Sequence, residues 1–102
     1  MPQCKKCNKK GLFLKIEEDT HLCLACNEAF AKAGKLLTEK IMQAKSATVT
    51  AQDKSKVAQY CSDIEKYGEE LMVLHAEFNI DPSQELIDLI DTYKKMREMA
   101  NG

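Results

Sequence analysis

Two Cys-x-x-Cys pairs near the N-terminus place the strongest constraint on how this 102-residue chain can fold. The first pair is Cys4 and Cys7, the second is Cys23 and Cys26, and residues 8–22 lie between them. Thiolates are soft ligands that suit zinc, and two pairs at about this separation are typical of a four-cysteine zinc site. We therefore predict that these four cysteines hold one structural Zn²⁺ ion.

The cysteine pattern leaves two other uses open. Iron in a rubredoxin-like site also accepts four thiolates, and a Cys-x-x-Cys pair can carry redox chemistry. A thioredoxin-type motif, however, would place one pair in a βαβ unit rather than two pairs facing each other. With four protein ligands, the metal has no position left for water or substrate. We therefore expect no enzyme activity and no small-molecule substrate.

The segment between the two pairs predicts a β-hairpin. Residues 8–11 are a polar turn in which we expect Gly11 to take a positive φ. Residues 12–16 place apolar side chains on one face, as a strand does. Residues 21–24 are the expected return strand, which brings Cys23 back to the first pair. A hairpin is needed because Zn–S bonds of about 2.3 Å require all four sulfur atoms to converge.

The rest of the chain predicts three helices. The first begins near Ala25, with Asn27 as its candidate cap, and fades near residues 46–49. The second covers about residues 50–78 and the third about residues 82–99. Short connections between them favour antiparallel neighbours. The predicted fold class is mainly α, with a small zinc-bound β-hairpin finger followed by three antiparallel helices.

Local signals mark the starts of the second and third helices. Residues 50–53 form a new N-cap sequence before the second helix. Asp81 is the expected N-cap of the third, with Pro82 at its first helical position. We divide the chain into a finger with the start of the first helix, residues 1–37, and a helical region, residues 38–102.

The second helix carries a heptad-like apolar seam. Gly68 lies in it and costs about 1 kcal/mol relative to alanine in a helix interior, so we expect another backbone to approach closely there. The seam packs within the chain or, where the helix overhangs its neighbours, forms a homodimer or partner interface. Its members are Val57, Cys61, Ile64, Gly68, Leu71, His75 and Phe78.

Three further residues were weighed as functional groups. His21 is close to the second cysteine pair, but four cysteines already satisfy a zinc ion, so we expect an exposed strand residue. His75 lies in the apolar seam and is expected to be a core or interface histidine. Cys61 has no neighbouring cysteine in the sequence and is expected to behave as a small buried hydrophobe.

Charge and cysteine usage indicate the compartment. The chain has 15 Lys and Arg against 16 Asp and Glu, a net charge of −1, which is typical of an ordinary soluble surface. No apolar run approaches the roughly 18 residues of a membrane helix, so we expect no membrane partner. We expect no signal peptide, and four of the five cysteines stand in metal-type pairs. The expected location is the reducing cytoplasm.

The order of knuckle, hairpin and a Cys-x-x-Cys that opens a helix resembles a treble-clef or zinc-ribbon-like finger. The run Cys-Lys-Lys-Cys-Asn-Lys-Lys-Gly-Leu-Phe-Leu-Lys also resembles N-terminal zinc modules of uncharacterised bacterial proteins. The resemblance covers residues 4–37. It implies a fold and a metal but no partner, because such fingers bind DNA, RNA and proteins alike. Many knuckles carry glycine where this chain has Asn8, which also tolerates the left-handed conformation.

The lysines of the finger suggest a second function. They are candidate phosphate contacts in a nucleic-acid-binding regulator, although the finger has no arginine and only Phe13 for base stacking. The leading hypothesis is a non-enzymatic zinc-binding adaptor or assembly module that acts through protein–protein contacts. We expect a protein partner or homodimer through a helical face, with nucleic acid as the alternative. The lysines are Lys5, Lys6, Lys9, Lys10 and Lys15.

Overall fold

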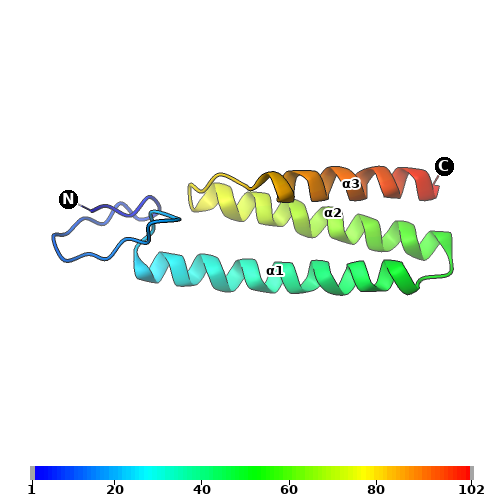
Figure 1. Ribbon diagram of the computed structural model, residues 1–102, viewed down its shortest axis with the longest axis horizontal. Coiled ribbons are helices and arrows are strands. Elements are labelled where there is room, and N and C mark those ends of the chain that lie inside the picture. Colours follow the sequence, from blue (N-terminus) through cyan, green and yellow to red (C-terminus); the bar gives the residue numbers. More distant parts are fainter. Residues whose placement is uncertain (1, 102) are drawn as a thin grey trace.

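A computed structural model describes residues 2–101 and contains three α-helices joined by short connections. They are α1 (Leu24–Thr50), α2 (Lys54–Glu77) and α3 (Gln84–Asn101). Each helix runs antiparallel to the one before it, and the N-terminal loops extend the structure beyond the start of α1 (Figure 1). The result is a rod of 57 × 18 × 16 Å. The predicted mainly helical fold is confirmed.

The central helix is α2, which packs against both α1 and α3. Its apolar seam is buried inside the chain: Cys61, Ile64, Gly68 and Leu71 are all buried. These four seam residues are used for packing within the chain, whereas Val57, His75 and Phe78 at the ends of the seam are half-buried. The main core combines Ile41 and Ala44 of α1 and Leu86 of α3 with buried residues of α2.

Gly68 of α2 lies in close contact with Ile90 of α3. A Cβ atom at this position would lie 2.6 Å from Cγ1 of Ile90. Real Cβ atoms do not come this close to another carbon, so the side chain of Ile90 occupies the space that glycine leaves. The expectation that another backbone approaches Gly68 is therefore wrong, because the close neighbour is the side chain of Ile90.

The helix starts agree with the sequence in α2 and differ in α3. Asp53 caps α2 by accepting a hydrogen bond from the Ser55 N–H at 3.0 Å. The prediction that Asp81 caps the third helix is wrong, because that helix begins two residues beyond Pro82. Instead, the Ser83 hydroxyl accepts from the Leu86 N–H at 3.2 Å, the usual N-cap geometry. Asp81 and Pro82 belong to the extended connection.

The N-terminal loops do not form the expected pair of strands. Within residues 2–101 the pairing is limited to two isolated antiparallel bridges, Gln3 with Lys10 and Ile16 with Cys23. Turns at residues 12–13 and 18–20 interrupt the extended backbone, and a left-handed residue, His21 (φ 59°), precedes the second bridge. The chain still returns from Ile16 to Cys23, as expected, but it does so without a regular β-hairpin.

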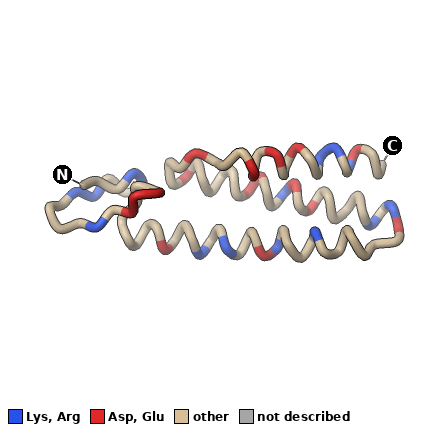
Figure 2. The backbone as a smooth tube through the Cα atoms, in the orientation of Figure 1, with Lys and Arg blue, Asp and Glu red and all other residues tan. Residues whose placement is uncertain are grey.

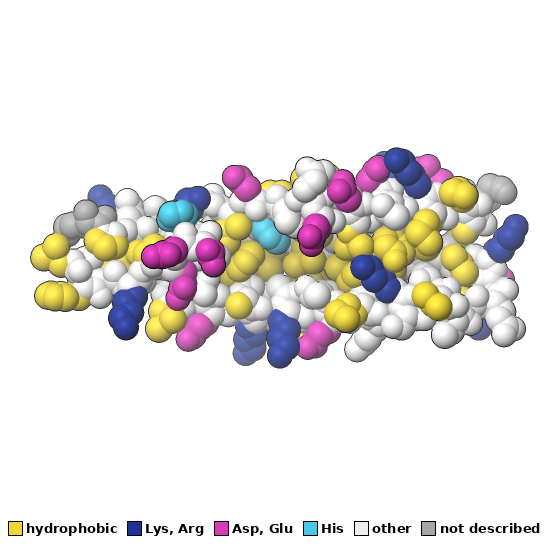
Figure 3. All heavy atoms as spheres, in the orientation of Figure 1, with side chains coloured by type: hydrophobic (Ala, Val, Ile, Leu, Met, Phe, Trp, Pro, Cys, Tyr) yellow, Lys and Arg dark blue, Asp and Glu magenta, His cyan; other side chains and the backbone are white. Residues whose placement is uncertain are grey.

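Charges and apolar side chains are unevenly distributed along the rod. Lys positions are frequent in the N-terminal loops, and the acidic turn at residues 17–19 lies beside the helices (Figure 2). Hydrophobic side chains form a band along the helix junction and gather again at the loop end (Figure 3). The loop end therefore combines basic and apolar surface.

Candidate metal centre

The first cysteine pair lies in a tight turn closed by backbone hydrogen bonds. The Asn8 N–H donates to the Cys4 carbonyl at 3.0 Å, and the Cys4 N–H donates to the Lys9 carbonyl at 3.1 Å. Asn8 has a φ of 61°, in the left-handed region where asparagine is tolerated. The expectation for Asn8 is confirmed. The positive φ expected at Gly11 is wrong, because Asn8 already provides the reversal.

The second pair lies at the start of α1. Cys23 is the N-cap residue, and the helix begins at Leu24, so Cys26 belongs to its first turn. Cys23 makes no side-chain cap hydrogen bond, which leaves its sulfur available to a ligand. Unpaired N–H groups and the dipole at a helix start favour negative charge, which stabilises a thiolate. Asn27, the predicted cap, instead lies inside the helix and accepts from the Thr20 hydroxyl at 2.9 Å.

The four cysteines converge on one point. Their sulfur atoms all lie within 4.8 Å of one another, and the sulfurs of Cys7 and Cys23 are 3.9 Å apart. Tetrahedral Zn–S bonds of about 2.3 Å place neighbouring sulfurs about 3.8 Å apart, a spacing that the Cys7 and Cys23 sulfurs match. Cys4 and Cys23 are buried, whereas Cys7 is exposed. The predicted convergence is confirmed, and the set can hold a metal ion.

The electrostatics of the cluster also suit a cation. Burial alone would raise the pKa of the Cys4 thiol, but hydrogen bonds from nearby backbone groups and from Cys7 outweigh it, and the pKa falls to about 6. Burial raises the pKa of the Cys26 thiol to about 12, with further contributions from hydrogen bonds to the other cysteines and from charge on Cys4. A thiolate is therefore favoured at Cys4, whereas Cys26 resists ionisation unless a positive ion balances its charge.

Side-chain contacts join the cysteine cluster to the connection between α2 and α3. Asn79, in the connection between α2 and α3, donates from Nδ2 to the Lys5 carbonyl at 2.9 Å. The Lys6 ammonium lies 5.3 Å from the centre of the Phe78 ring, within cation–π distance. Phe30 of α1 packs against Phe78, with ring centres 5.4 Å apart. These contacts hold the loops against the helices.

The other three candidate residues, His21, His75 and Cys61, lie outside the cysteine cluster. His21 is exposed and is not among the clustered ligands, but it sits in a left-handed turn rather than in a strand. His75 is half-buried, with Nδ1 2.7 Å from the Leu71 carbonyl, and its ring meets Phe30 edge-on. Cys61 is fully buried in the helical core, where burial raises its pKa. Cys61 and His75 therefore have the packing roles expected of them.

The five candidate lysines are all exposed, and none forms an ion pair with another residue in the range 2–101. Lys5 and Lys6 lie next to the helices through the contacts described above. The remaining three, Lys9, Lys10 and Lys15, flank the turn at residues 11–14, which we call the outer loop.

Sequence reasoning missed Asn79 and Thr20. The signal for Asn79 was its position just after a predicted helix, where asparagine often takes the left-handed conformation, as it does here with a φ of 56°. Its partner, the backbone of Lys5, is 74 residues away and leaves no trace in the local pattern.

None of the described helices has the length and apolar character needed to cross a bilayer. Comparisons with protein-family models, with curated proteins and with solved structures find no match to this chain.

Proposed function

We propose that this chain is a non-enzymatic zinc-binding adaptor or assembly module. The convergence of four cysteine sulfurs, one pair in a turn and one at a helix start, carries the proposal. We assign one structural Zn²⁺ to Cys4, Cys7, Cys23 and Cys26, in a treble-clef-like finger. A bound ion supplies cross-links between loops that have little regular structure of their own. A four-sulfur shell leaves no position for a substrate, which supports a structural rather than a catalytic metal.

The proposed compartment is the reducing cytoplasm. All five cysteines are free thiols in the structure, and four of them must remain unoxidised to bind a metal. Iron is the competing ion, because it accepts the same four thiolates. Metal analysis of protein purified without added metal distinguishes the two, and a 1:1 content of zinc is the expected result.

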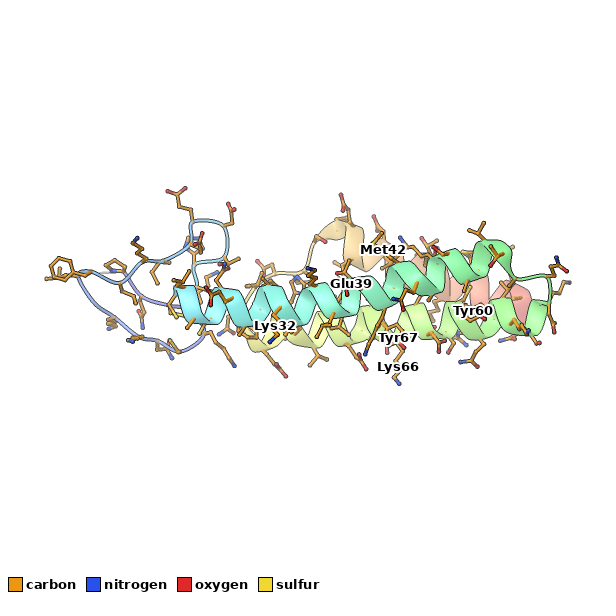
Figure 4. All side chains as sticks on the ribbon, turned by 90° about the horizontal axis from the view of Figure 1, so that it is seen from below. Lys32, Glu39, Met42, Tyr60, Lys66 and Tyr67 are labelled. Atoms are coloured by element: carbon orange, nitrogen blue, oxygen red, sulfur yellow. The ribbon has the colours of Figure 1, made fainter. Side chains whose placement is uncertain are left out.

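A groove between α1 and α2 supports the assembly role. Tyr60 and Tyr67 are both half-buried and lie one heptad apart on α2, along the line where it passes beside α1 (Figure 4). Ala44 and Ala47 of α1 line the same hollow of about 220 Å³, and a second hollow continues from Ala47 and Tyr60. Tyrosine is enriched at protein interfaces relative to the rest of the surface. We propose this groove as the helical face that receives a second copy or another helical protein.

A solution-mass measurement tests the groove. We expect the metal-loaded protein to show concentration-dependent self-association by light scattering between about 10 and 200 μM, a range in which weak dimers with micromolar Kd become visible. The double variant Tyr60→Ser/Tyr67→Ser should remain monomeric, whereas Val73→Ser, an exposed apolar site elsewhere on α2, should behave as wild type. A monomer at every concentration would remove the homodimer form of the proposal.

The alternative function is nucleic-acid binding, favoured by the exposed lysines of the finger. Lysine contacts to phosphate release counterions, so such binding must weaken steeply with salt. Fluorescence anisotropy with generic DNA and RNA at 20 mM and 200 mM salt tests it. Absence of binding at the lower salt would remove this alternative and leave the adaptor.

A further inference from the structure

The outer loop carries apolar side chains where a turn usually carries polar ones. The Leu14 N–H donates to the Gly11 carbonyl at 3.2 Å, which closes a four-residue turn. Leu12 and Phe13 occupy its two central positions, where Gly, Asn, Asp, Ser and Pro are the usual residues. Leu12 is 76% exposed and Phe13 is 97% exposed, so neither stabilises the fold by burial.

The neighbouring residues explain why these two side chains point outward. Leu14 and Ile16 pack against the buried cluster of Cys4, Leu22 and Cys23, which anchors the base of the loop. The turn then projects Leu12 and Phe13 away from that base. A hollow of about 400 Å³ beside Phe13 extends to Leu24, which is also exposed, so the apolar surface continues toward the start of α1.

Exposed lysines flank this apolar tip on both sides in the sequence. Lys9 and Lys10 precede the turn and Lys15 follows it, and all three are exposed and form no ion pair among residues 2–101. The nearest acidic cluster, residues 17–19, lies back beside the helices (Figure 2). The tip is therefore apolar, its rim is positive, and its complement is an anionic surface with an apolar interior.

We propose that the tip formed by Leu12 and Phe13, with Lys9, Lys10 and Lys15 around it, docks reversibly on an anionic lipid bilayer surface. Aromatic and aliphatic side chains enter the interfacial region, while lysines contact anionic headgroups. A surface contact of this kind needs no membrane-spanning helix. The proposal departs from the expectation, drawn from the sequence, that no membrane is a partner, and it is independent of the groove between α1 and α2.

The size and shape of the tip favour lipid over the other anionic partners. A stable protein interface buries about 800 Å² on each partner, far more than two side chains offer. Nucleic acid would use the lysines and could stack on Phe13, but it gains little from Leu12. A bilayer surface accepts a convex tip without a matching pocket, and a small apolar insertion combined with a few lysines gives weak, reversible binding.

Vesicle flotation with the metal-loaded protein tests the proposal. We expect binding to vesicles of equal parts phosphatidylglycerol and phosphatidylcholine, and at least tenfold weaker binding to pure phosphatidylcholine. The variants Leu12→Ser/Phe13→Ser and Lys9→Gln/Lys10→Gln/Lys15→Gln should each weaken binding tenfold or more while keeping the metal content of wild type. Equal binding by wild type and both variants, or no binding by wild type, would overturn the proposal.

Matched control variants distinguish vesicle binding through the tip from non-specific binding through other exposed apolar or basic side chains. Val49→Ser/Met99→Ser removes two side chains that are 85% and 79% exposed on α1 and α3, and it should bind as wild type does. Lys54→Gln/Lys56→Gln/Lys66→Gln removes the same charge from α2 and should lose less than threefold. A loss in these controls equal to that of the tip variants would reject a specific docking site.

A spectroscopic variant reports the tip directly. The chain contains no tryptophan, so Phe13→Trp introduces a single fluorophore at the most exposed apolar site. We expect a blue shift with anionic vesicles and quenching by brominated lipid. If emission instead stays unchanged with vesicles and the Leu12→Ser/Phe13→Ser variant keeps salt-sensitive DNA or RNA binding, the lysines serve nucleic acid and the lipid proposal is wrong.

Discussion

The side-chain amide of Asn79 donates to the backbone carbonyl of Lys5 at 2.9 Å and so joins residues 74 positions apart in the sequence. The contact links the turn of the first cysteine pair to the connection between α2 and α3. Both partners lie at the junction where the Phe30, Phe78 and Lys6 side chains also meet. The loop that carries the first cysteine pair is therefore packed against the helices by several side-chain contacts.

Replacing Asn79 by glycine should measure this link. Glycine keeps the left-handed backbone that Asn79 adopts, at φ 56°, and removes only the side chain. We expect the free energy of unfolding of the metal-loaded protein to fall by about 1 kcal/mol more than in Asn8→Gly, because one hydrogen bond is lost. Asn8 shares the conformation (φ 61°) but no side-chain hydrogen bond is found for it within residues 2–101. Equal losses in urea unfolding would show that the hydrogen bond contributes nothing.

Removing one metal ligand should unfold the loops and spare most of the helices. In Cys23→Ser we expect less than stoichiometric zinc, loss of dispersed amide signals from residues 2–23, and fraying of the first turn of α1. Far-ultraviolet circular dichroism should keep most of its helical signal, because the main core lies along α1, α2 and α3. Cys61→Ala is the matched control, since its thiol is buried among the helices. It should retain full zinc while losing roughly 1 kcal/mol of stability to a small cavity.

Two helical glycines should respond in opposite directions to alanine. In Gly68→Ala the new Cβ meets Cγ1 of Ile90 at 2.6 Å, and we expect a loss of about 1–3 kcal/mol from overpacking. In Gly34→Ala the nearest atom, Cδ2 of Leu74, is 3.9 Å away, so helix propensity should stabilise the protein by up to about 1 kcal/mol.

A double variant identifies the cause of the loss at Gly68. Combining Gly68→Ala with Ile90→Ala removes the clashing atom, so the two losses should sum to more than the loss of the double variant. Thermal or urea unfolding of the four proteins gives the comparison. Additive losses would place the strain elsewhere than at Ile90.

Acid should weaken the cap of α2 through Asp53. The hydrogen bond from the Ser55 backbone lowers the pKa of this carboxyl below its ordinary value of 3.8. A lowered pKa stabilises the folded state above pH 3.8, and the contribution disappears as the pH falls through the lowered value. Asp53→Asn keeps a capping oxygen without the charge. We expect the difference in Tm between wild type and this variant to shrink from pH 5 to pH 2.5, and a constant difference would contradict it.

The sequence predicted the parts of this fold that depend on local chemistry. Cysteine spacing anticipated the four-sulfur cluster, Asp53 anticipated a cap, and the periodicity of α2 anticipated its buried face. The cost of glycine in a helix interior pointed to a close neighbour at Gly68, but that neighbour is the Ile90 side chain and not the expected backbone.

The differences arise where two local signals compete or where a distant contact decides. Asp81 and Ser83 are both good N-caps, and Ser83 is used while Pro82 remains in the extended connection. Alternation in residues 12–16 suggested a strand, but the turn at Leu12 and Phe13 and the left-handed His21 limit pairing to a single bridge there. The Asn79 contact depends on the docking of loops onto helices, which no local pattern records.

The helix α1 starts at the residue after Cys23, so no flexible spacer separates the sulfur cluster from the rod. A molecule that binds and fixes the N-terminal loops would therefore also fix the direction of α1. Because the 27 residues of α1 extend about 40 Å from the sulfur cluster at 1.5 Å per residue, a tilt of about 10° at the cluster would displace the far end of α1 by about 7 Å. The position of a partner bound at the far end of the helices would therefore depend on the tilt of α1 as well as on its length.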